Sequence, residues 1–584
     1  MTRDDQQKTI PAFDRTWEKA QGISQIGSGE IGGKAQGLLL LRDFVAAMDT
    51  SLFDPIDIAV PTFTVIATDV FDDFLERNDL HPLAQSGESD ERIAHAFQRA
   101  TLPSEVLGDL RALTQRVSWP LAIRSSSRLE DALHRPFAGV YETKMTPNNQ
   151  ADSNTRFQKL VEAIKFVYAS TFFGAAQEYL KTIPDRQGDE KMAVIIQEVL
   201  GTRHQERFYP NVSGVCRTFN FYPLGDVPRD DGIVDLALGL GKVIVDDGVS
   251  YSYVPSHPKR PPPFSSTRDF LQNSQTKFWA VNMGKPSAFD PTQETEYLVR
   301  AGLSEAEYDD ALTYIVSTYD PESERLSPGV GRPGPRVVSF APLLQLDALP
   351  LNKALTAMMD ESRRRVGRDV EIEFAMTFPD SQEGGRPQLG FVQVRPMVTS
   401  DEVVNIETAD LRAPNVLVSS ERVMGNGSVD VIRDVVYTRP DKFDLSKTPI
   451  IADELRRLNS ELLLAKRPYL LIGFGRWGSS DPWLGIPTKW GQISGVQAIV
   501  EATLADRVIE ASQGTHFFHN ITSFGVSYFH VSSSAVPGVQ WSWLESREAV
   551  QETQYLRHIR LDQTLLVKVD GRTGVGGIWC PEGT

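Results

Sequence analysis

Strand-like and helix-like segments alternate through the first half of the chain, and this alternation is the strongest constraint on its fold. Strand candidates lie at residues 58–66, 192–197 and 213–219, and helix candidates lie at residues 34–48 and 70–75. Interleaved segments of the two kinds favour a mixed α/β architecture. Because 41% of the residues are apolar and 23% are charged, the composition is that of a globular protein with buried cores.

Charge and cysteine content restrict the expected binding partners and the expected cellular compartment. The net charge of −17 argues against nonspecific binding to nucleic acid or to anionic membranes, because both need a positive field. The two cysteines, Cys216 and Cys580, are far apart in sequence, which fits a reducing compartment. The N-terminus is polar, and no run approaches the roughly 20 apolar residues of a membrane span. We therefore expect a cytoplasmic protein with neither nucleic acid nor membrane as partner.

Composition also divides the chain into segments. Residues 1–20 are polar and are expected to form a flexible N-terminus, and residues 21–400 to form the first large unit. Within that unit, proline-rich residues 255–335 are expected to be an insert or connector. A polar, acidic stretch near residues 400–412 suggests a junction, so residues 401–584 form a second, smaller unit.

A cation follows one of the buried strand candidates directly. The apolar residues 119–123 lead into Arg124, three serines at residues 125–127 and, further on, Gly139. Arginine is always charged, and its planar fork of donors suits phosphate oxygens. This stretch predicts a polyphosphate site. An ordinary strand and loop with a surface arginine is the alternative that this stretch alone leaves open.

Two glycine-rich turns also suit a phosphate site. In Gly32-Gly33-Lys34 the glycines let the backbone approach phosphate oxygens, and the lysine supplies a mobile charge. Gly239-Leu240-Gly241 forms a similar turn beside a strand. A solvated lysine in the first and a purely structural turn in the second are the competing interpretations.

A pair of strands in the middle of the chain carries metal-binding side chains. Alternation places Glu371 and Glu373 on one strand face, and Gln393 and Arg395 on one face of the next strand. If the strands are antiparallel, a carboxylate and an amide can together bind Mg²⁺. This ion prefers such oxygen ligands. A surface ladder of salt bridges is the alternative.

The buried strand candidate at residues 192–197 continues into three residues that can line a base pocket. Gln197, Glu198 and Val199 could offer backbone groups to the edge of a purine. Many core strands have the same pattern, so this reading depends on the other motifs.

Taken in order, these motifs resemble the nucleotide-binding domain of phosphoenolpyruvate synthase and pyruvate phosphate dikinase. The resemblance covers roughly residues 20–400 and implies an ATP-grasp-like fold, in which ATP lies between two α/β subdomains. The motifs that carry it are Gly32-Gly33-Lys34, Val60-Pro61, Arg124-Ser125-Ser126 with Glu130-Asp131 and Phe137-Ala138-Gly139, Met192-Ala193-Val194, Ser213-Gly214-Val215, Gly239-Leu240-Gly241, Glu371-Ile372-Glu373 and Gln393-Val394-Arg395-Pro396.

The resemblance implies ligands for ATP and for a metal ion. Lys34 and Arg124 would hold phosphates, and residues 197–199 would line the adenine pocket. Lys242 stands where the family usually has an acidic residue, which puts the contacts around residues 239–242 in doubt. The implied ATP-binding residues are Lys34, Arg124, Gln197, Glu198, Val199, Gly239 and Gly241. Glu373 and Gln393 would bind Mg²⁺, and Arg395 would contact the transferred phosphoryl group.

The second unit is similar, more loosely, to the phosphohistidine domain that swivels between active sites in those enzymes. Ser512-Gln513-Gly514-Thr515-His516 resembles the turn that carries their phosphorylated histidine. A neutral imidazole is nucleophilic near pH 7, so His516 is the expected acceptor. His519 is the alternative acceptor, and a packed core histidine is the competing reading of His516. An acceptor pocket is also conceivable, formed by Arg476, Trp477 and Trp483.

The sequence thus predicts an ATP- and Mg²⁺-dependent phosphotransferase that phosphorylates a histidine and then an unidentified acceptor. Between His516 and Thr584 the chain is too short for the pyruvate-binding barrel of about 250 residues. Two alternatives stay open: a nucleotide-binding regulatory module without transfer activity, and an ATP-grasp ligase. The sequence leaves undecided whether ADP or AMP is released, and whether the protein forms a homo-oligomer or acts with a separate partner protein.

Overall fold

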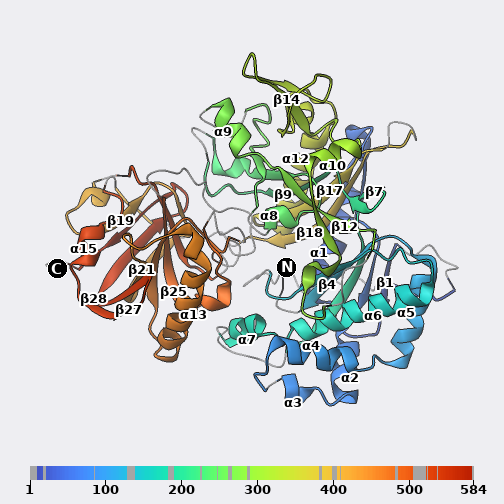
Figure 1. Ribbon diagram of the computed structural model, residues 1–584, viewed down its shortest axis with the longest axis horizontal. Helices are drawn as coiled ribbons and strands as arrows, with labels where there is room; N and C mark the ends of the chain where they lie inside the picture. Colours follow the sequence, from blue (N-terminus) through green and yellow to red (C-terminus); the bar gives the residue numbers. More distant parts are fainter. Residues whose placement is uncertain are drawn as a thin grey trace.

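The computed structural model has a mixed α/β fold (Figure 1). It describes residues 10–16, 22–84, 86–127, 130, 139–181, 190–223, 227–245, 248–260, 266–285, 290–379, 384–397, 404–407, 409–479, 485–503, 521, 524–535 and 537–581.

The first sheet has five strands in the order β1-β3-β6-β4-β5. All residues of β6 except its last are buried, as expected for an apolar run between two neighbouring strands. Helix α6 packs on β4 and β5, and helices α4 and α5 pack on α6. The strands are β1 (Ile23–Ile26), β3 (Phe63–Ile66), β4 (Leu121–Ser127), β5 (Thr143–Thr146) and β6 (Met192–Glu198). The helices of this region are α2 (Thr68–Arg77), α3 (His81–Ala84), α4 (Asp90–Arg99), α5 (Ser104–Arg116), α6 (Ser153–Ser170) and α7 (Gly174–Lys181).

The second sheet has six strands in the order β11-β10-β9-β17-β18-β2. Helix α1 lies on β18, and α12 packs on both β17 and α1. Since α1 also contacts β4, it lies between the two sheets. The elements are α1 (Gly32–Ala47), β2 (Asp57–Ala59), β9 (Val212–Arg217), β10 (Ile233–Ala237), β11 (Tyr251–Tyr253), α12 (Leu351–Val366), β17 (Val370–Thr377) and β18 (Gln388–Pro396).

The proline-rich residues 255–335 contain strands as well as connecting segments. They contribute to a four-stranded sheet, β13-β12-β8-β7, and to a three-stranded sheet, β15-β14-β16. The elements of these two sheets and of the segments next to them are β7 (Thr202–His204), β8 (Arg207–Tyr209), α8 (Lys242–Val245), α9 (Thr267–Gln272), β12 (Lys277–Asn282), β13 (Leu298–Gly302), α10 (Leu303–Tyr308), β14 (Val316–Asp320), β15 (Arg325–Pro328), β16 (Arg336–Val338) and α11 (Ala341–Leu344).

The C-terminal sheet has the strand order β19-β29-β28-β21-β22-β25-β26-β20, with β27 paired to β28. Strands β21, β22, β25 and β26 are parallel, and α13 connects β21 to β22. The strands are β19 (Val416–Ser420), β20 (Val423–Met424), β21 (Gly427–Thr438), β22 (Tyr469–Phe474), β25 (Val496–Ala502), β26 (Ser527–Val531), β27 (Ala549–Glu552), β28 (Leu556–Asp570) and β29 (Val575–Trp579). The other elements are α13 (Thr448–Leu464), the short pair β23 (Arg476–Trp477) and β24 (Gly485–Ile486), and α15 (Trp541–Glu545).

None of the helices in the described ranges has the length and apolar character needed to cross a lipid bilayer.

A buried ionic cluster in the C-terminal sheet predicts a pH-dependent contribution to stability. Asp434 is 2% exposed and lies 2.8 Å from His558 Nε2, while Arg467 Nε donates to it over 3.0 Å. Burial alone would raise the pKa of Asp434, but hydrogen bonds from His558 and Arg467 outweigh it and hold the pKa below its ordinary value. A carboxyl with a lowered pKa stabilises the fold above its unfolded pKa of about 3.9, and this stabilisation is lost as the pH falls through the folded pKa.

We expect Asp434→Asn to lower the free energy of unfolding at pH 7 by about 1–3 kcal/mol, because the buried partners lose their anion. Urea unfolding at pH 7, pH 5 and pH 3 measures this. The difference between variant and wild type should shrink at the lowest pH, and a difference that is constant from pH 7 to pH 3 would contradict the assigned cause.

Candidate functional site

Arg124 joins the first sheet to the second. From the middle of β4, its Nη1 atom donates to the Val392 carbonyl over 2.8 Å and to Gln197 Oε1 over 3.1 Å. Its Nη2 atom donates to Gln393 Oε1 and lies 3.7 Å from Glu373 Oε2. The Arg124 side chain is 13% exposed. The Arg124 guanidinium therefore contacts three of the predicted site residues, Gln197, Glu373 and Gln393.

Strand register explains why these side chains meet. In the antiparallel pair of β17 and β18, Glu373 lies opposite Gln393 and Glu371 opposite Arg395. The strands are antiparallel, which is the condition under which a carboxylate and an amide can bind one ion together. In the first sheet, Gln197 of β6 lies opposite Ala122, two residues before Arg124, so both polar side chains leave the same face.

Glu373 and Gln393 fit the donor set of a magnesium ion. They present a carboxylate and an amide oxygen across one strand pair, which is the hard-oxygen chemistry that Mg²⁺ takes. The described residues contain no group of three or more His, Cys, Asp or Glu placed to hold a metal. Glu373 and Gln393 alone would therefore leave the coordination of the ion incomplete, and nucleotide phosphates could supply the remaining oxygen ligands.

Lys34 is fixed at the N-terminus of α1 by the segment that follows Arg124. Its Nζ atom lies 2.9 Å from Glu130 Oε1 and 3.3 Å from Ser125 Oγ. Glu130 is completely buried and also accepts hydrogen bonds from Ser125 Oγ and the Ser127 backbone N–H. Ser126 Oγ accepts from the Ala35 N–H over 3.1 Å. The predicted phosphate ligands Lys34 and Arg124 thus belong to one connected structure.

Glu130 is a site residue that the sequence did not single out for a role. It was part of the motif after Arg124, but the sequence did not show that its carboxylate would meet Lys34. The sequence shows only that Glu130 follows Arg124 by six residues, after three serines. This pattern is too common to predict the partner of the carboxylate.

Gly32 is required by the close approach of α1 to β4. Its φ is +75°, and a Cβ atom there would lie 1.8 Å from the Ser126 carbonyl oxygen. Because the obstacle is backbone, no side-chain rotation relieves it. We expect Gly32→Ala to destabilise the protein by more than about 3 kcal/mol, or to displace α1 and weaken nucleotide binding.

Gly367 provides the matched control. It has nearly the same φ, +73°, but a Cβ atom there would meet no atom within 4 Å. Gly367→Ala should cost only about 1 kcal/mol from its backbone conformation. Thermal unfolding of both variants measures the difference. Equal losses would show that φ, and not the contact with Ser126, decides the effect.

Arg395 lies in a buried ionic network beneath the Arg124 cluster. It is 1% exposed, and its Nε atom donates to Glu371 Oε1 over 2.7 Å. Arg217 Nη1 lies 3.9 Å from Glu371 Oε2, and Arg217 also donates to Asp235. The predicted contact of Arg395 with a phosphoryl group stays a prediction, and its replacement would also disturb the core.

The predicted adenine-pocket residues lie at the end of β6, where Gln197 accepts a hydrogen bond from Arg124. Gln197 is 3% exposed, and its Nε2 atom is buried without a hydrogen bond to the described residues. Burial raises the pKa of Glu198. The backbone N–H groups of Glu198 and Val199 already donate to Thr62 and Pro120 carbonyls, so they are not available to a base. Gln197 therefore has the open donor in this segment.

The turn at Gly239 and Gly241 has a packing role. Gly239 has a φ of +83°, and a Cβ atom there would lie 2.7 Å from the Trp279 carbonyl oxygen. Ser213 Oγ donates to the Gly239 carbonyl over 2.7 Å. Lys242 donates to Glu294 over 2.9 Å. The nucleotide contacts predicted for Gly239 and Gly241 stay predictions.

The predicted phosphoryl acceptors, His516 and His519, lie outside the described residues. So does Trp483 of the suggested acceptor pocket. Trp477, suggested as part of an acceptor pocket, is 1% exposed, and its Nε1 atom donates to the Val500 carbonyl over 3.4 Å. Its ring packs where a Cβ atom on Gly473 would lie, so Trp477 belongs to the core.

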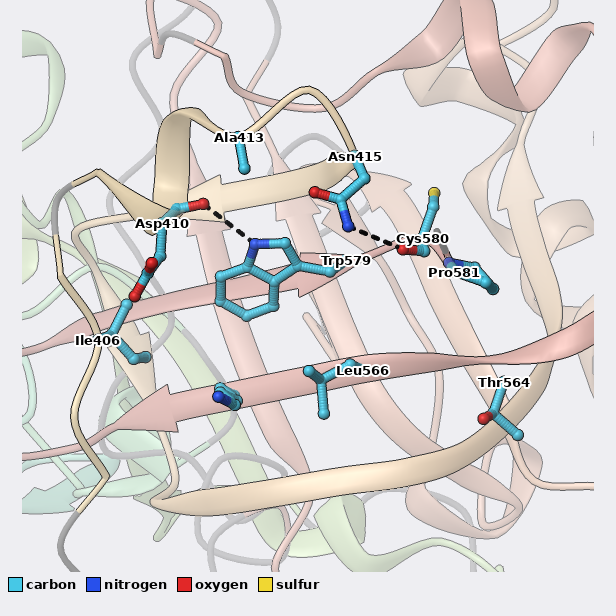
Figure 2. Close-up of a pocket in the computed structure, with 10 residues that line it drawn as sticks. Ile406, Asp410, Ala413, Asn415, Thr564, Leu566, Trp579, Cys580 and Pro581 are labelled. Carbon is cyan, nitrogen blue, oxygen red and sulfur yellow. Dashed lines mark hydrogen bonds between the residues drawn. The ribbon is translucent and has the colours of Figure 1, made fainter. Parts of the chain in front are cut away.

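A cavity of about 390 Å³ lies at an edge of the C-terminal sheet, beside β19, β28 and β29 (Figure 2). The indole N–H of Trp579 donates to the Asp410 carbonyl over 3.0 Å, and Asn415 donates to the Cys580 carbonyl over 3.1 Å. None of the predicted site residues lines this cavity. It is therefore separate from the Arg124 cluster of the first two sheets.

The first two sheets with their helices, joined through Arg124 and Lys34 and carrying Glu373 and Gln393, define an ATP-grasp-like nucleotide-binding region. Residues 28–413 match the family described as pyruvate phosphate dikinase, AMP/ATP-binding domain, and the chain belongs to this family. The sequence is also 24% identical over 196 residues to a Bacillus subtilis (strain 168) protein named uncharacterized phosphotransferase YvkC. That alignment covers 33% of this chain and 20% of the relative, so the chain spans about a fifth of its length.

Proposed function

We propose that the protein is an ATP- and Mg²⁺-dependent phosphotransferase that transfers a phosphoryl group from ATP to one of its own histidines and then to an acceptor. The observation that carries this proposal is the convergence of Arg124, Gln197, Glu373 and Gln393 between the two sheets. Family membership over residues 28–413 supports the ATP-binding part.

Each residue has a distinct role in this proposal. Lys34 and Arg124 bind and orient the phosphates, and Glu373 and Gln393 hold Mg²⁺. The ion would neutralise charge on the phosphate oxygens when bound. Arg124 now contacts Gln393 and Glu373, the two residues that would hold the ion, and its guanidinium would be able to bind phosphate oxygens beside them. Positioning and charge neutralisation are what phosphoryl transfer needs from a protein.

The acceptor histidine belongs to residues 401–584 in this proposal. His516 is the candidate that the sequence motif supplies, with His519 as its alternative. A nucleotide-binding regulatory module is the rival function, in which ATP binds but no bond is broken.

Labelled ATP tests the proposal. The full chain is incubated with Mg²⁺ and ATP labelled in the β or the γ phosphate, and the nucleotides and the protein-bound label are analysed. We expect ADP or AMP as product together with an acid-labile, alkali-stable phosphate on the protein. ATP binding without cleavage would instead support the regulatory module. Cleavage only in the presence of an amine and a carboxylate would support a ligase.

Lys34→Met should weaken ATP binding about tenfold to a hundredfold, because a charge-assisted hydrogen bond to phosphate contributes about 1.5–3 kcal/mol. Isothermal titration calorimetry measures the Kd. Lys159→Met is the matched control, since Lys159 forms a similar pair with Glu162 at 2.8 Å but lies on α6. Unchanged ATP affinity in Lys34→Met would remove Lys34 from the site.

A further inference from the structure

The C-terminal sheet contains a buried cluster of three ionisable side chains at one end of two parallel strands. Glu501 lies near the carboxyl end of β25, directly beside His530 of β26. His530 Nδ1 is 3.2 Å from Glu501 Oε1, and the Tyr528 hydroxyl donates to Glu501 Oε2. Glu501 is 1% exposed and His530 is 5% exposed. Ligand sites in α/β proteins tend to form at this end of parallel strands.

The Glu501 carboxylate fixes the imidazole of His530. A carboxylate accepts but does not donate, so it selects the tautomer with a proton on Nδ1 and leaves Nε2 as the unprotonated nitrogen. Within the described ranges, His530 Nε2 makes no hydrogen bond. A nucleophile oriented by a carboxylate, with its other ring nitrogen outside that hydrogen bond, is an arrangement that suits covalent catalysis.

His558, the other histidine placed in the C-terminal sheet, lacks this property. Its Nε2 atom lies 2.8 Å from Asp434 Oδ1, in the cluster with Arg467. Its Nδ1 atom is buried without a hydrogen-bond partner among the placed residues. One ring nitrogen of His558 therefore contacts the Asp434 carboxylate, and the other is buried in the sheet.

The Glu501 cluster also faces the ATP-binding region. The guanidinium of Arg422 lies over the ring of Tyr222, 5.6 Å from its centroid, and the Arg422 carbonyl accepts from the His530 N–H over 2.9 Å. Burial and the nearby charge of Glu501 both raise the pKa of Tyr222. Tyr222 follows β9, whose last residue is Arg217 in the Glu371 network. A short segment thus connects the end of the second sheet that carries Arg395 with the His530 cluster.

We propose that His530 Nε2 accepts the phosphoryl group from ATP, with Glu501 as its positioning residue. This inference rests on the proposed function and assigns the acceptor role to His530 in place of His516. Written for the terminal phosphoryl group, the Nε2 lone pair forms a bond to phosphorus as the bond from phosphorus to the bridging oxygen breaks. That oxygen leaves with its electron pair on ADP. The positive charge that develops on the imidazole is balanced by Glu501.

Site mapping on the wild-type full chain tests the proposal. After separate incubations with Mg²⁺ and ATP labelled in the β or the γ phosphate, an alkaline digest is analysed by mass spectrometry. We expect the phosphate on the peptide that contains His530. His530→Asn should abolish the label, while His95→Asn, at an exposed histidine on α4, should keep it. A phosphate on His516 or His519 would overturn this inference and keep the proposed function. Absence of any phosphohistidine would overturn both.

Glu501→Gln tests the positioning role separately. We expect it to slow phosphorylation about tenfold to a hundredfold with unchanged ATP affinity, because residues that orient a reactive imidazole have effects of this size. It should also change the pH dependence of the phosphorylation rate, and Glu501→Asp should restore part of the rate. If Glu501 has only a structural role, Glu501→Gln would lower the melting temperature, and the pH dependence of the phosphorylation rate of the folded protein would not change. That result would overturn the assignment.

Discussion

Replacing Glu373 with glutamine is expected to lower kcat for ATP cleavage at least about 100-fold, because the proposed magnesium ion loses its charged protein ligand. The amide keeps the size of the side chain and one oxygen. Glu373 is only partly buried, with 18% of its side chain exposed, and its recorded charged neighbour is Arg124 at 3.7 Å. The loss should therefore appear in catalysis and metal binding while the fold persists.

Manganese binding separates this explanation from a general defect. Mn²⁺ replaces Mg²⁺ at oxygen sites and can be followed by electron paramagnetic resonance in the presence of ATP. We expect Glu373→Gln to weaken Mn²⁺ binding in parallel with kcat. Glu307→Gln is the matched control, because Glu307 pairs with Arg336 over 2.8 Å in a different part of the molecule. If Glu373→Gln retains full turnover, the metal site lies elsewhere.

Local periodicity was sufficient to predict the strand pair that holds the metal candidates. Glu371 and Glu373 are two residues apart, as are Gln393 and Arg395, and strand geometry requires each pair to share a face. The observed register pairs Glu373 with Gln393 and Glu371 with Arg395. The mixed α/β architecture followed from the same kind of pattern.

Contacts between the sheets could not be predicted in this way. Arg124 and Gln393 are separated by 269 positions, and no sequence period links them. Their hydrogen bond depends on how α1, β4 and β18 pack, which is a property of the assembled core. The sequence also did not show that Arg395 is buried, because an arginine beside a glutamate in adjacent strands reads equally well as a surface salt bridge.

The same reasoning applies to the second unit. The sequence motif points to His516, because Gly514-Thr515-His516 resembles a known turn. Glu501 and His530 are separated by 29 positions and form no motif. Their relation arises only from the parallel pairing of β25 with β26, and a parallel pair requires a long connection whose length sequence patterns do not restrict.

Glu371→Gln is expected to lower the free energy of unfolding by about 3–5 kcal/mol, which is the usual effect of removing one partner of a buried ion pair. Glu371 is 3% exposed and lies between the guanidinium groups of Arg395 and Arg217. Without its charge, Arg395 would be a buried cation in the same sheet as the metal candidates. Arg217 would keep Asp235 as its anion. Urea unfolding followed by tryptophan fluorescence measures the loss.

The surface pair of Glu361 with Arg364 on α12 provides the comparison for this prediction. Its atoms are 2.7 Å apart, but Arg364 is 67% exposed, so Glu361→Gln should change the free energy of unfolding by no more than about 1 kcal/mol. A loss at Glu371 that is no larger than the loss at Glu361 would contradict the importance of burial.

A double variant distinguishes the loss of the buried ion pair from lost packing. Arg395→Met removes the cation and keeps an apolar side chain of similar length, so Glu371→Gln with Arg395→Met should be more stable than Glu371→Gln alone. If the two losses simply add, the network stabilises the sheet through shape and not through charge. If stability returns without ATP cleavage, Arg395 also has a part in the reaction, because the double variant would then be folded but inactive.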